Sequence, residues 1–152
     1  MSEAFRGIRH RILSQPRDPE KLRREVIDMR RRMHRELGSK SADLFHLKQD
    51  PGGIADIEFL VQYGVLAWSA RHPSLTEWTD NVRILESFTA RDLMSEADAK
   101  TLNDAYLALR AREHAQALQG NKGMAPINEI TALRQHVLSI WDRLMAGPDT
   151  DS

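Results

Sequence analysis

The stretch "GIADIEFLVQYGVLAWSAR", residues 53–71, decides the fold because apolar side chains would occupy nearly the whole circumference of a helix with this sequence. A helix with one apolar face lies at a protein surface, whereas a helix that is apolar on all sides is buried. The sequence therefore predicts a helix from Gly53 to about Arg71 that is buried on most sides.

The turn before this helix contains Pro51, Gly52 and Gly53, and it allows three interpretations. The first is a metal site, in which Asp56 and Glu58 form an Asp-x-Glu pair of the kind that binds Mg²⁺ in phosphoryl transfer. Residues two apart on a helix are rotated by about 200° from each other, so a helical Asp56 and Glu58 would not hold one ion together.

The second interpretation is an anion site, because free N–H groups at a helix start attract phosphate and Lys48 adds positive charge. The third is a plain turn, with Asp56 in the first helical turn, where a carboxylate favours the positive end of the helix dipole. Helical geometry argues against the metal pair and leaves the other two interpretations open.

A second helix is predicted over residues 18–38. Asp18 is a favourable N-cap, Pro19 suits the first helical position, and Gly38 is a natural terminator. One face carries an apolar stripe at spacings of three and four, formed by Leu22, Val26, Met29, Met33 and Leu37. A shorter helix precedes it, over about residues 3–14, with apolar positions at Phe5, Ile8 and Ile12.

Three more helices are predicted after the central one. Thr79 or Asp80 caps a helix that contains Val82, Leu85 and Phe88. Ser95 and Asp98 resemble a capping box and open a long helix with an apolar face of Leu102, Ala105, Tyr106 and Leu109. After "GNKGMAP" (residues 120–126), the last amphipathic helix carries Ile130, Leu133, Val137, Ile140, Trp141 and Leu144.

These elements predict an all-α fold, a bundle of about six helices with no significant sheet. Residues 39–53 form a connector in which "LFHLK" (residues 44–48) is briefly extended. We expect one helical-bundle domain over residues 1–147 and a disordered tail over residues 148–152.

The composition excludes several classes of protein. The chain has 152 residues and no cysteine, so disulfides and thiolate metal sites are both excluded. No apolar run approaches the roughly 20 residues of a membrane helix, and the N-terminal sequence lacks the apolar core of a signal peptide. These features lead us to expect a cytoplasmic protein.

The balanced net charge conceals a basic N-terminal quarter. Residues 1–38 hold eleven Lys or Arg and six Asp or Glu, which leaves eleven basic and sixteen acidic residues in the remainder. The cluster "RRRMHR" (residues 30–35) is a candidate for gripping nucleic acid or phosphate, but its arginines alternate with apolar and acidic positions as on a solvated helix face. None of the six histidines lies in an HExxH pattern, and no nucleophile elbow is present.

Four longer segments carry a family resemblance: "LRREVIDMRRRMHREL" (22–37), "LKQDPGGIADIEFLVQY" (47–63), "HPSLTEWTDNVRILE" (72–86) and "LNDAYLALRAREHAQALQG" (102–120). Together they resemble, in order, the C-terminal helical region of the bifunctional glutamine-synthetase adenylyltransferase/deadenylylase family. The resemblance covers roughly residues 5 to 145.

The resemblance implies a parent enzyme with two nucleotidyltransferase domains, each followed by a helical bundle. One half adenylylates a tyrosine of glutamine synthetase with ATP and Mg²⁺, and the other removes AMP by phosphorolysis. Glutamine and the PII signal protein set the direction. The implied partners of this chain are therefore the nucleotidyltransferase domain of the same polypeptide, glutamine synthetase and PII.

The family's catalytic signature, a Gly-Ser followed downstream by Asp-x-Asp on a strand, is not matched. Gly38–Ser39 is followed by no Asp-x-Asp, and the nearest pair, Asp56-x-Glu58, falls in the helical block. The resemblance therefore implies that this chain is a supporting bundle that binds no cofactor and has no catalytic residues or metal ligands of its own.

Carried over position by position, the "GGI-DIEF" block implies a location close to the catalytic module. We expect these residues at an interdomain surface or active-site rim: Lys48, Gly52, Gly53, Asp56, Glu58, Asp80, Asn81 and Arg83. His46 departs from the family pattern, which often has an acidic residue there. The alternative function is a free-standing helical module that binds another protein or nucleic acid through its basic N-terminal hairpin.

Overall fold

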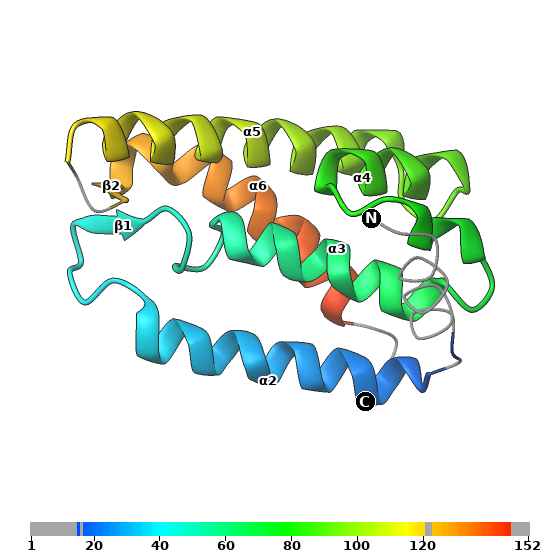
Figure 1. Ribbon diagram of the computed structural model, residues 1–152. Coiled ribbons are helices and arrows are strands. Elements are labelled where there is room, and N and C mark those ends of the chain that lie inside the picture. The colour runs from blue at the N-terminus through cyan, green and yellow to red at the C-terminus, as the bar shows by residue number, and fades with distance from the viewer. Residues whose placement is uncertain (1–14, 16, 121–122, 147–152) are drawn as a thin grey trace.

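We describe the fold from a computed structural model in which residue 15, residues 17–120 and residues 123–146 are placed (Figure 1). The helix predicted over about residues 3–14 and the tail predicted over residues 148–152 lie outside these described residues. Neither prediction is tested.

The described residues are mostly helical, as predicted. They form five α-helices and one short 3₁₀ helix: α2 (Pro19–Leu37), α3 (Ile54–Trp68), η1 (Pro73–Glu77), α4 (Asn81–Ala90), α5 (Glu96–Leu118) and α6 (Ile127–Ala146). A count of six is not confirmed, because the sixth predicted helix falls in the undescribed N-terminal residues. None of the described helices is both long enough and apolar enough to cross a membrane.

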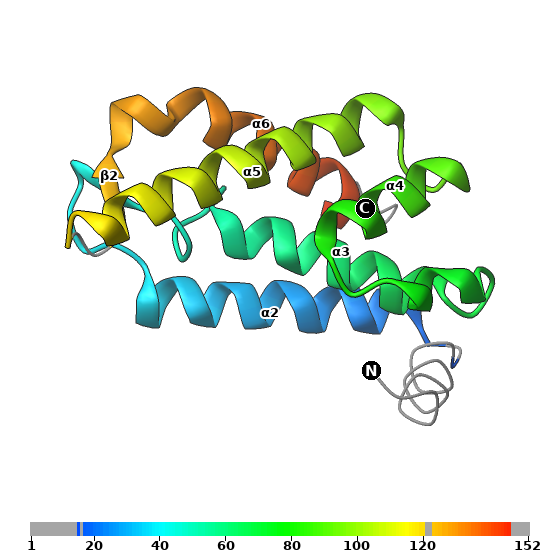
Figure 2. The same cartoon turned by 45° about the horizontal axis from the view of Figure 1, so that its top comes forward.

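Helix α3 is the centre of the bundle. It packs against α2, α4, α5 and α6, and Figures 1 and 2 show it between α2 on one side and the other helices on the other side. Its buried residues lie on every side of the helix: Ile54, Ala55, Asp56, Ile57, Leu60, Val61, Tyr63, Gly64 and Val65. The prediction of a helix enclosed on most sides is confirmed.

The described residues contain one small sheet of two three-residue strands, in keeping with the prediction of no significant sheet, and its first strand falls in the segment 44–48 that was predicted to be briefly extended. Strand β1 (Leu44–His46) and strand β2 (Met124–Pro126) pair antiparallel, with Phe45 opposite Ala125. They lie in the α2–α3 and α5–α6 connectors, which meet at one end of the bundle (Figure 1). Three residues are too few to show a period of two, so β2 had no signal in the sequence.

The helix caps follow the predictions. The Asp18 carboxylate accepts from the Glu20 N–H, and the Asp80 carboxylate accepts from the N–H groups of Val82 and Arg83. Ser95 caps α5 through the Asp98 N–H, at 3.1 Å. Such caps satisfy N–H groups that have no partner within the helix.

The predicted apolar stripe of α2 is only partly buried. Leu22 lies in the core and Val26 packs against it, but Met29 and Leu37 are 56% and 53% exposed. The buried arc of α2 is rotated from the predicted stripe toward Arg23 and Arg30, two neighbouring positions that the periodicity did not include. The basic cluster is therefore not uniformly solvated, since Arg30 points inward.

Gly64 provides a test of the close approach between α3 and α4. A Cβ atom at this position would lie 2.5 Å from Cζ of Phe88 and 2.8 Å from Cζ3 of Trp68. Helix propensity alone predicts that Gly64→Ala stabilises the fold by about 1 kcal/mol. Overpacking costs about 1–3 kcal/mol, so we expect a net loss in the free energy of unfolding, measured by urea denaturation.

The matched control is the same substitution in a Phe88→Leu background, where the shorter side chain leaves space. There the loss should shrink or reverse, giving a coupling energy between the two positions. A stabilising effect of Gly64→Ala in the otherwise unchanged protein would contradict the close packing described here.

Candidate functional site

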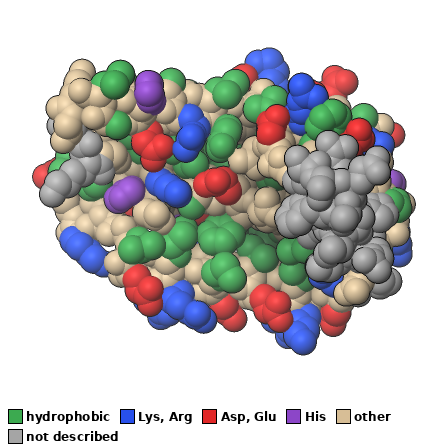
Figure 3. Space-filling model, in the orientation of Figure 1, with side chains coloured by type: hydrophobic (Ala, Val, Ile, Leu, Met, Phe, Trp, Pro, Cys, Tyr) green, Lys and Arg blue, Asp and Glu red, His purple; other side chains and the backbone are tan. Residues whose placement is uncertain are grey.

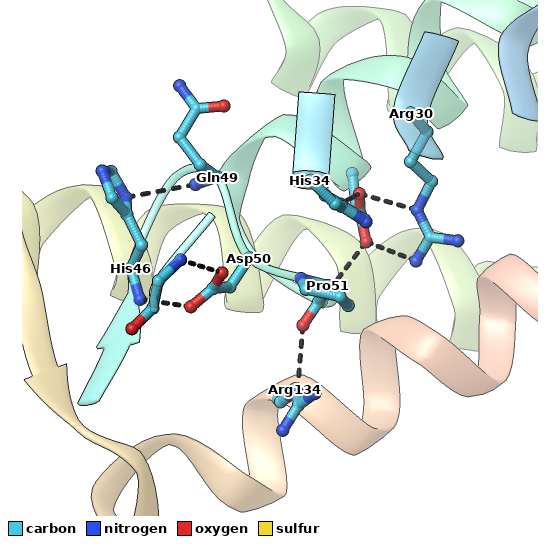
Figure 4. Close-up of polar contacts among 10 residues, drawn as sticks. Arg30, His34, His46, Gln49, Asp50, Pro51 and Arg134 are labelled. Atoms are coloured by element: carbon cyan, nitrogen blue, oxygen red, sulfur yellow. Dashed lines mark hydrogen bonds and ion pairs between the residues drawn. The ribbon is translucent and has the colours of Figure 1, made fainter. Parts of the chain in front are cut away.

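The α2–α3 junction is organised around a buried carboxylate, and we call the group of Asp56, Arg30, His34 and the Gly52 N–H the clasp. Asp56 is fully buried. Arg30 donates from Nε and Nη2 to its two oxygens at 2.9 and 2.7 Å, and the Gly52 N–H donates at 2.7 Å. His34 Nε2 lies 3.2 Å from Oδ1 (Figure 4). Both carboxylate oxygens therefore have two partners each, Oδ1 from α2 alone and Oδ2 from α2 and the connector.

The clasp keeps Asp56 ionised. Burial by itself would raise the pKa of this carboxyl, but hydrogen bonds from His34 and Arg30, the charge of Arg30 and the Gly52 N–H outweigh it. The pKa of Asp56 consequently lies below its ordinary value of 3.8. Because a bidentate arginine–carboxylate pair also fixes orientation, the clasp determines how α2 lies against α3.

Arg30 extends the clasp to the last helix. The centre of its guanidinium lies 3.9 Å from the ring centroid of Trp141 on α6. A guanidinium over an indole face is attracted by the ring electrons, most strongly where water is excluded. One side chain of α2 thus contacts both α3 and α6.

A second set of bonds holds the connector between α2 and α3. The Asp50 carboxylate accepts from the N–H groups of Ser39 and His46, at 2.7 and 2.8 Å. Arg134 of α6 donates from Nε to the Pro51 carbonyl at 3.0 Å (Figure 4). The connector is therefore tied to α6, and Asp50 joins the last part of the connector to its beginning and its middle.

The two glycines are required by this geometry. Gly52 has a φ of 86°, and a Cβ atom there would lie 2.6 Å from Cγ of Arg134. At Gly53 a Cβ atom would lie 2.6 Å from the Leu47 carbonyl oxygen. The Gly-Gly pair therefore allows close backbone packing, which agrees with the interpretation of this segment as a plain turn.

The anion-site interpretation of the helix start is not supported. The N–H groups of Gly53, Ile54 and Ala55 donate to the carbonyls of Asp50, Leu47 and Lys48 at 2.9, 2.9 and 3.0 Å. With the Gly52 N–H on Asp56, none of these four amides is free to bind a phosphate.

A second observation argues against the metal-pair interpretation, in addition to the different directions of Asp56 and Glu58 on the helix. Both oxygens of Asp56 are engaged by cationic or N–H donors, while Glu58 is partly exposed. Within the part of the chain that the structure describes, no group of three or more His, Cys, Asp or Glu side chains is arranged to hold a metal ion.

The eight predicted rim residues fall into two groups. Lys48, Gly52, Gly53, Asp56 and Glu58 surround the start of α3, and Asp80, Asn81 and Arg83 form the start of α4. Figures 1 and 2 place these two helix starts apart along the bundle. In the second group, Arg83 packs over Trp78 at 4.5 Å from the ring centroid and pairs with Asp80 at 3.7 Å. The structure does not bring the two groups together.

The sequence interpretation missed the partners of Asp56. Arg30 and His34 are four residues apart, a spacing that puts both on one helix face. They lie within "RRRMHR", where the neighbouring Arg31, Arg32 and Arg35 are exposed and conceal the inward-facing pair. A buried carboxylate at the start of an apolar helix was the available signal, because such a charge needs a cation.

Residues 20–124 match the protein family described as GlnD PII-uridylyltransferase. A "Bifunctional glutamine synthetase adenylyltransferase/adenylyl-removing enzyme" of Pseudomonas putida is 44% identical over 153 residues, which cover 93% of this chain and 16% of the relative. Proteins of the same name from Thioalkalivibrio sulfidiphilus and Pseudomonas aeruginosa are 44% and 41% identical, over 95% of this chain in each case.

The matches cover very different shares of this chain and of its relatives. They include nearly all of this chain, but the chain spans only 15–16% of the length of the curated relatives. The similarity is therefore to a small segment of a much larger protein.

The clasp predicts a large effect of Asp56→Asn. The substitution keeps the shape but leaves Arg30, whose side chain is 14% exposed, without its ionic partner. We expect a loss of about 3 kcal/mol in the free energy of unfolding, measured by urea denaturation. In the matched control Asp104→Asn, which removes an exposed pair with Lys100, the loss should stay below about 0.5 kcal/mol. Equal effects of the two substitutions would contradict the clasp.

The lowered pKa of Asp56 predicts a specific pH dependence. Since the folded-state pKa lies below the unfolded value, the contribution of Asp56 is complete above the unfolded pKa and is lost as the pH falls through the folded pKa. The stability difference between the unmodified chain and Asp56→Asn should therefore shrink between about pH 5 and pH 3. Subtracting the two stabilities removes the effect of the other carboxylates, because these titrate in both proteins. A difference that stays constant over this range would show that Asp56 has an ordinary pKa.

Proposed function

Because this chain belongs to the GlnD PII-uridylyltransferase family, we propose that it is a helical domain of an enzyme that adenylylates and deadenylylates glutamine synthetase. The observation that carries this proposal is the 44% identity, over 93% of the chain, to a bifunctional enzyme named for those two activities. In this role the domain takes part in the control of nitrogen assimilation.

The domain supports the transfer reaction and does not carry it out. Adenylyl transfer from ATP needs carboxylates that converge on Mg²⁺. The nearest pair in this chain contains Asp56, whose two oxygens bond to Arg30 and the Gly52 N–H. ATP and Mg²⁺ would therefore bind in the remaining part of the longer enzyme.

The rim residues divide into those that make contacts and those that shape the surface. Lys48 and Arg83 are exposed and Glu58 is partly exposed, so their side chains are accessible to a neighbouring domain. Gly52, Gly53 and Asp56 are buried, and they would act by fixing the connector that presents Lys48. Asp80 would hold Arg83 in place through their ion pair, and Asn81 would lie beside them on the same surface at the start of α4.

Glutamine synthetase and the PII signal protein are the partners that this function implies. Both partner proteins would bind the longer enzyme, and this domain would contribute a rigid surface to it. The bond from Ser39 to Asp50 within the α2–α3 connector and the bond from Arg134 of α6 to Pro51 support such rigidity, because they fix a loop that would otherwise be mobile.

A segment exchange tests the proposal. The matching segment of the Pseudomonas putida relative is replaced by this chain, and the chimera is incubated with ATP, Mg²⁺ and glutamine synthetase. We expect adenylylated glutamine synthetase to form, detected as an AMP adduct by mass spectrometry. The 152-residue chain alone should form none under the same conditions.

The controls separate folding from function. The chimera must show a cooperative melting transition, and the relative with its own segment deleted serves as the negative control. A folded chimera with no more activity than the deleted protein would contradict the proposed function. Adenylylation by the chain alone would contradict the supporting role.

A further inference from the structure

An apolar stripe runs along the outer edge of α2 and has no cover among the described residues. Met29, Met33 and Leu37 are four residues apart and so lie on one side of the helix. Met29 is 56% exposed, Leu37 is 53% exposed, and Met33 is half-buried. We call these three residues the α2 stripe. In Figure 3 hydrophobic side chains gather in a band just above the charged lower edge of the molecule, over α2 and its border with α3.

The stripe continues into a groove. Leu22 lies seven residues before Met29 on the same side of α2. Together with Leu66 of α3 it lines a groove of about 560 Å³, whose charged edge is formed by Arg17, Asp18, Lys21 and Glu25. Apolar surface with a concave end and a charged rim is typical of a docking site, since scattered single apolar residues form no such continuous band.

The other end of the stripe reaches the site described above. Leu37 is the last residue of α2, and the Ser39 N–H two residues later bonds to Asp50 of the connector. The stripe therefore ends beside the connector that carries the exposed Lys48.

The geometry points to the α2 stripe as the docking surface for the nucleotidyltransferase domain of the longer polypeptide. This inference rests on the proposed function and names the surface through which it operates. The chain spans only 15–16% of its relatives, so most of the polypeptide remains to pack against it. Interfaces between domains of one chain combine an apolar centre with polar edges.

The charges beside the stripe indicate what the neighbouring domain presents. Glu25, Arg32 and Glu36 are exposed and lie four, three and seven residues from Met29, so they border it on one side. The facing surface should have an apolar centre flanked by basic side chains opposite the two glutamates. A nucleic acid, which lacks an apolar surface of that kind and carries negative charge, does not fit.

The native methionines report directly on this surface. Hydrogen peroxide oxidises accessible methionine side chains, and mass spectrometry gives the rate at each one. In the 152-residue chain, exposed Met29 should oxidise faster than Met94, which is 7% exposed. In the Pseudomonas putida chimera, we expect Met29 to oxidise about tenfold more slowly than in the chain alone, while Met94 is slow in both.

Three other oxidation results would overturn the inference. Equal oxidation of Met29 in the chain and in the chimera would show that the stripe stays open. Protection that rises with the concentration of the chain alone would assign the stripe to a second copy. Protection in the dilute chain alone would assign it to residues 1–14. An active chimera with unprotected Met29 would leave the proposed function standing, whereas an inactive chimera with protected Met29 would remove only that function.

A pair of variants supplies a second readout. Met29→Gln/Leu37→Gln should lower the adenylylation rate of the chimera about tenfold and leave the melting temperature of the chain alone unchanged. The matched control Leu107→Gln/Leu118→Gln removes two leucines from α5 that are 51% and 76% exposed. The control should keep the rate, and an equal loss in both variants would overturn the assignment to α2.

Discussion

A carboxylate with no exposed surface stays ionised inside a protein only if cations and N–H groups surround it. Asp56 meets that condition because Arg30 supplies both a charge and two hydrogen bonds, and the Gly52 N–H supplies another. Removing one member of such a pair leaves the other charge buried, which costs more than the pair itself contributes. The position of α2 on the central helix is therefore fixed by one side chain that the interior cannot leave unpaired.

Several other features follow from that constraint. Arg30 reaches Asp56 only if α2 turns its apolar stripe partly away from the core, which exposes Met29 and Leu37. The Gly52 N–H reaches Asp56 only through a turn with positive φ, and the Gly-Gly pair permits the turn. The same turn places the Pro51 carbonyl on Arg134, so α6 is joined to the connector. The exposed stripe and the fixed connector thus have one physical origin, and they form adjacent parts of one surface.

The sequence was sufficient for features that depend on local pattern. The apolar circumference of residues 53–71 predicted the central helix, which the structure places at Ile54–Trp68, and Asp18, Thr79 or Asp80, and Ser95 predicted three helix starts. It was insufficient where contacts join distant segments. Strand β2 is three residues long and pairs with a strand far earlier in the chain. Periodicity also treated Arg30 as solvated because arginine is usually exposed, and only tertiary packing shows that its partner is Asp56.

The central claim is that Asp56 and Arg30 act as one unit in the buried junction, and a double-mutant cycle measures this most directly. The free energy of unfolding is determined for the unmodified chain, Arg30→Gln, Asp56→Asn and the double variant. Strong coupling predicts an interaction energy of about 2 kcal/mol or more, with the double variant nearly as stable as either single one. Additive effects, with an interaction energy below about 0.5 kcal/mol, would contradict the claim.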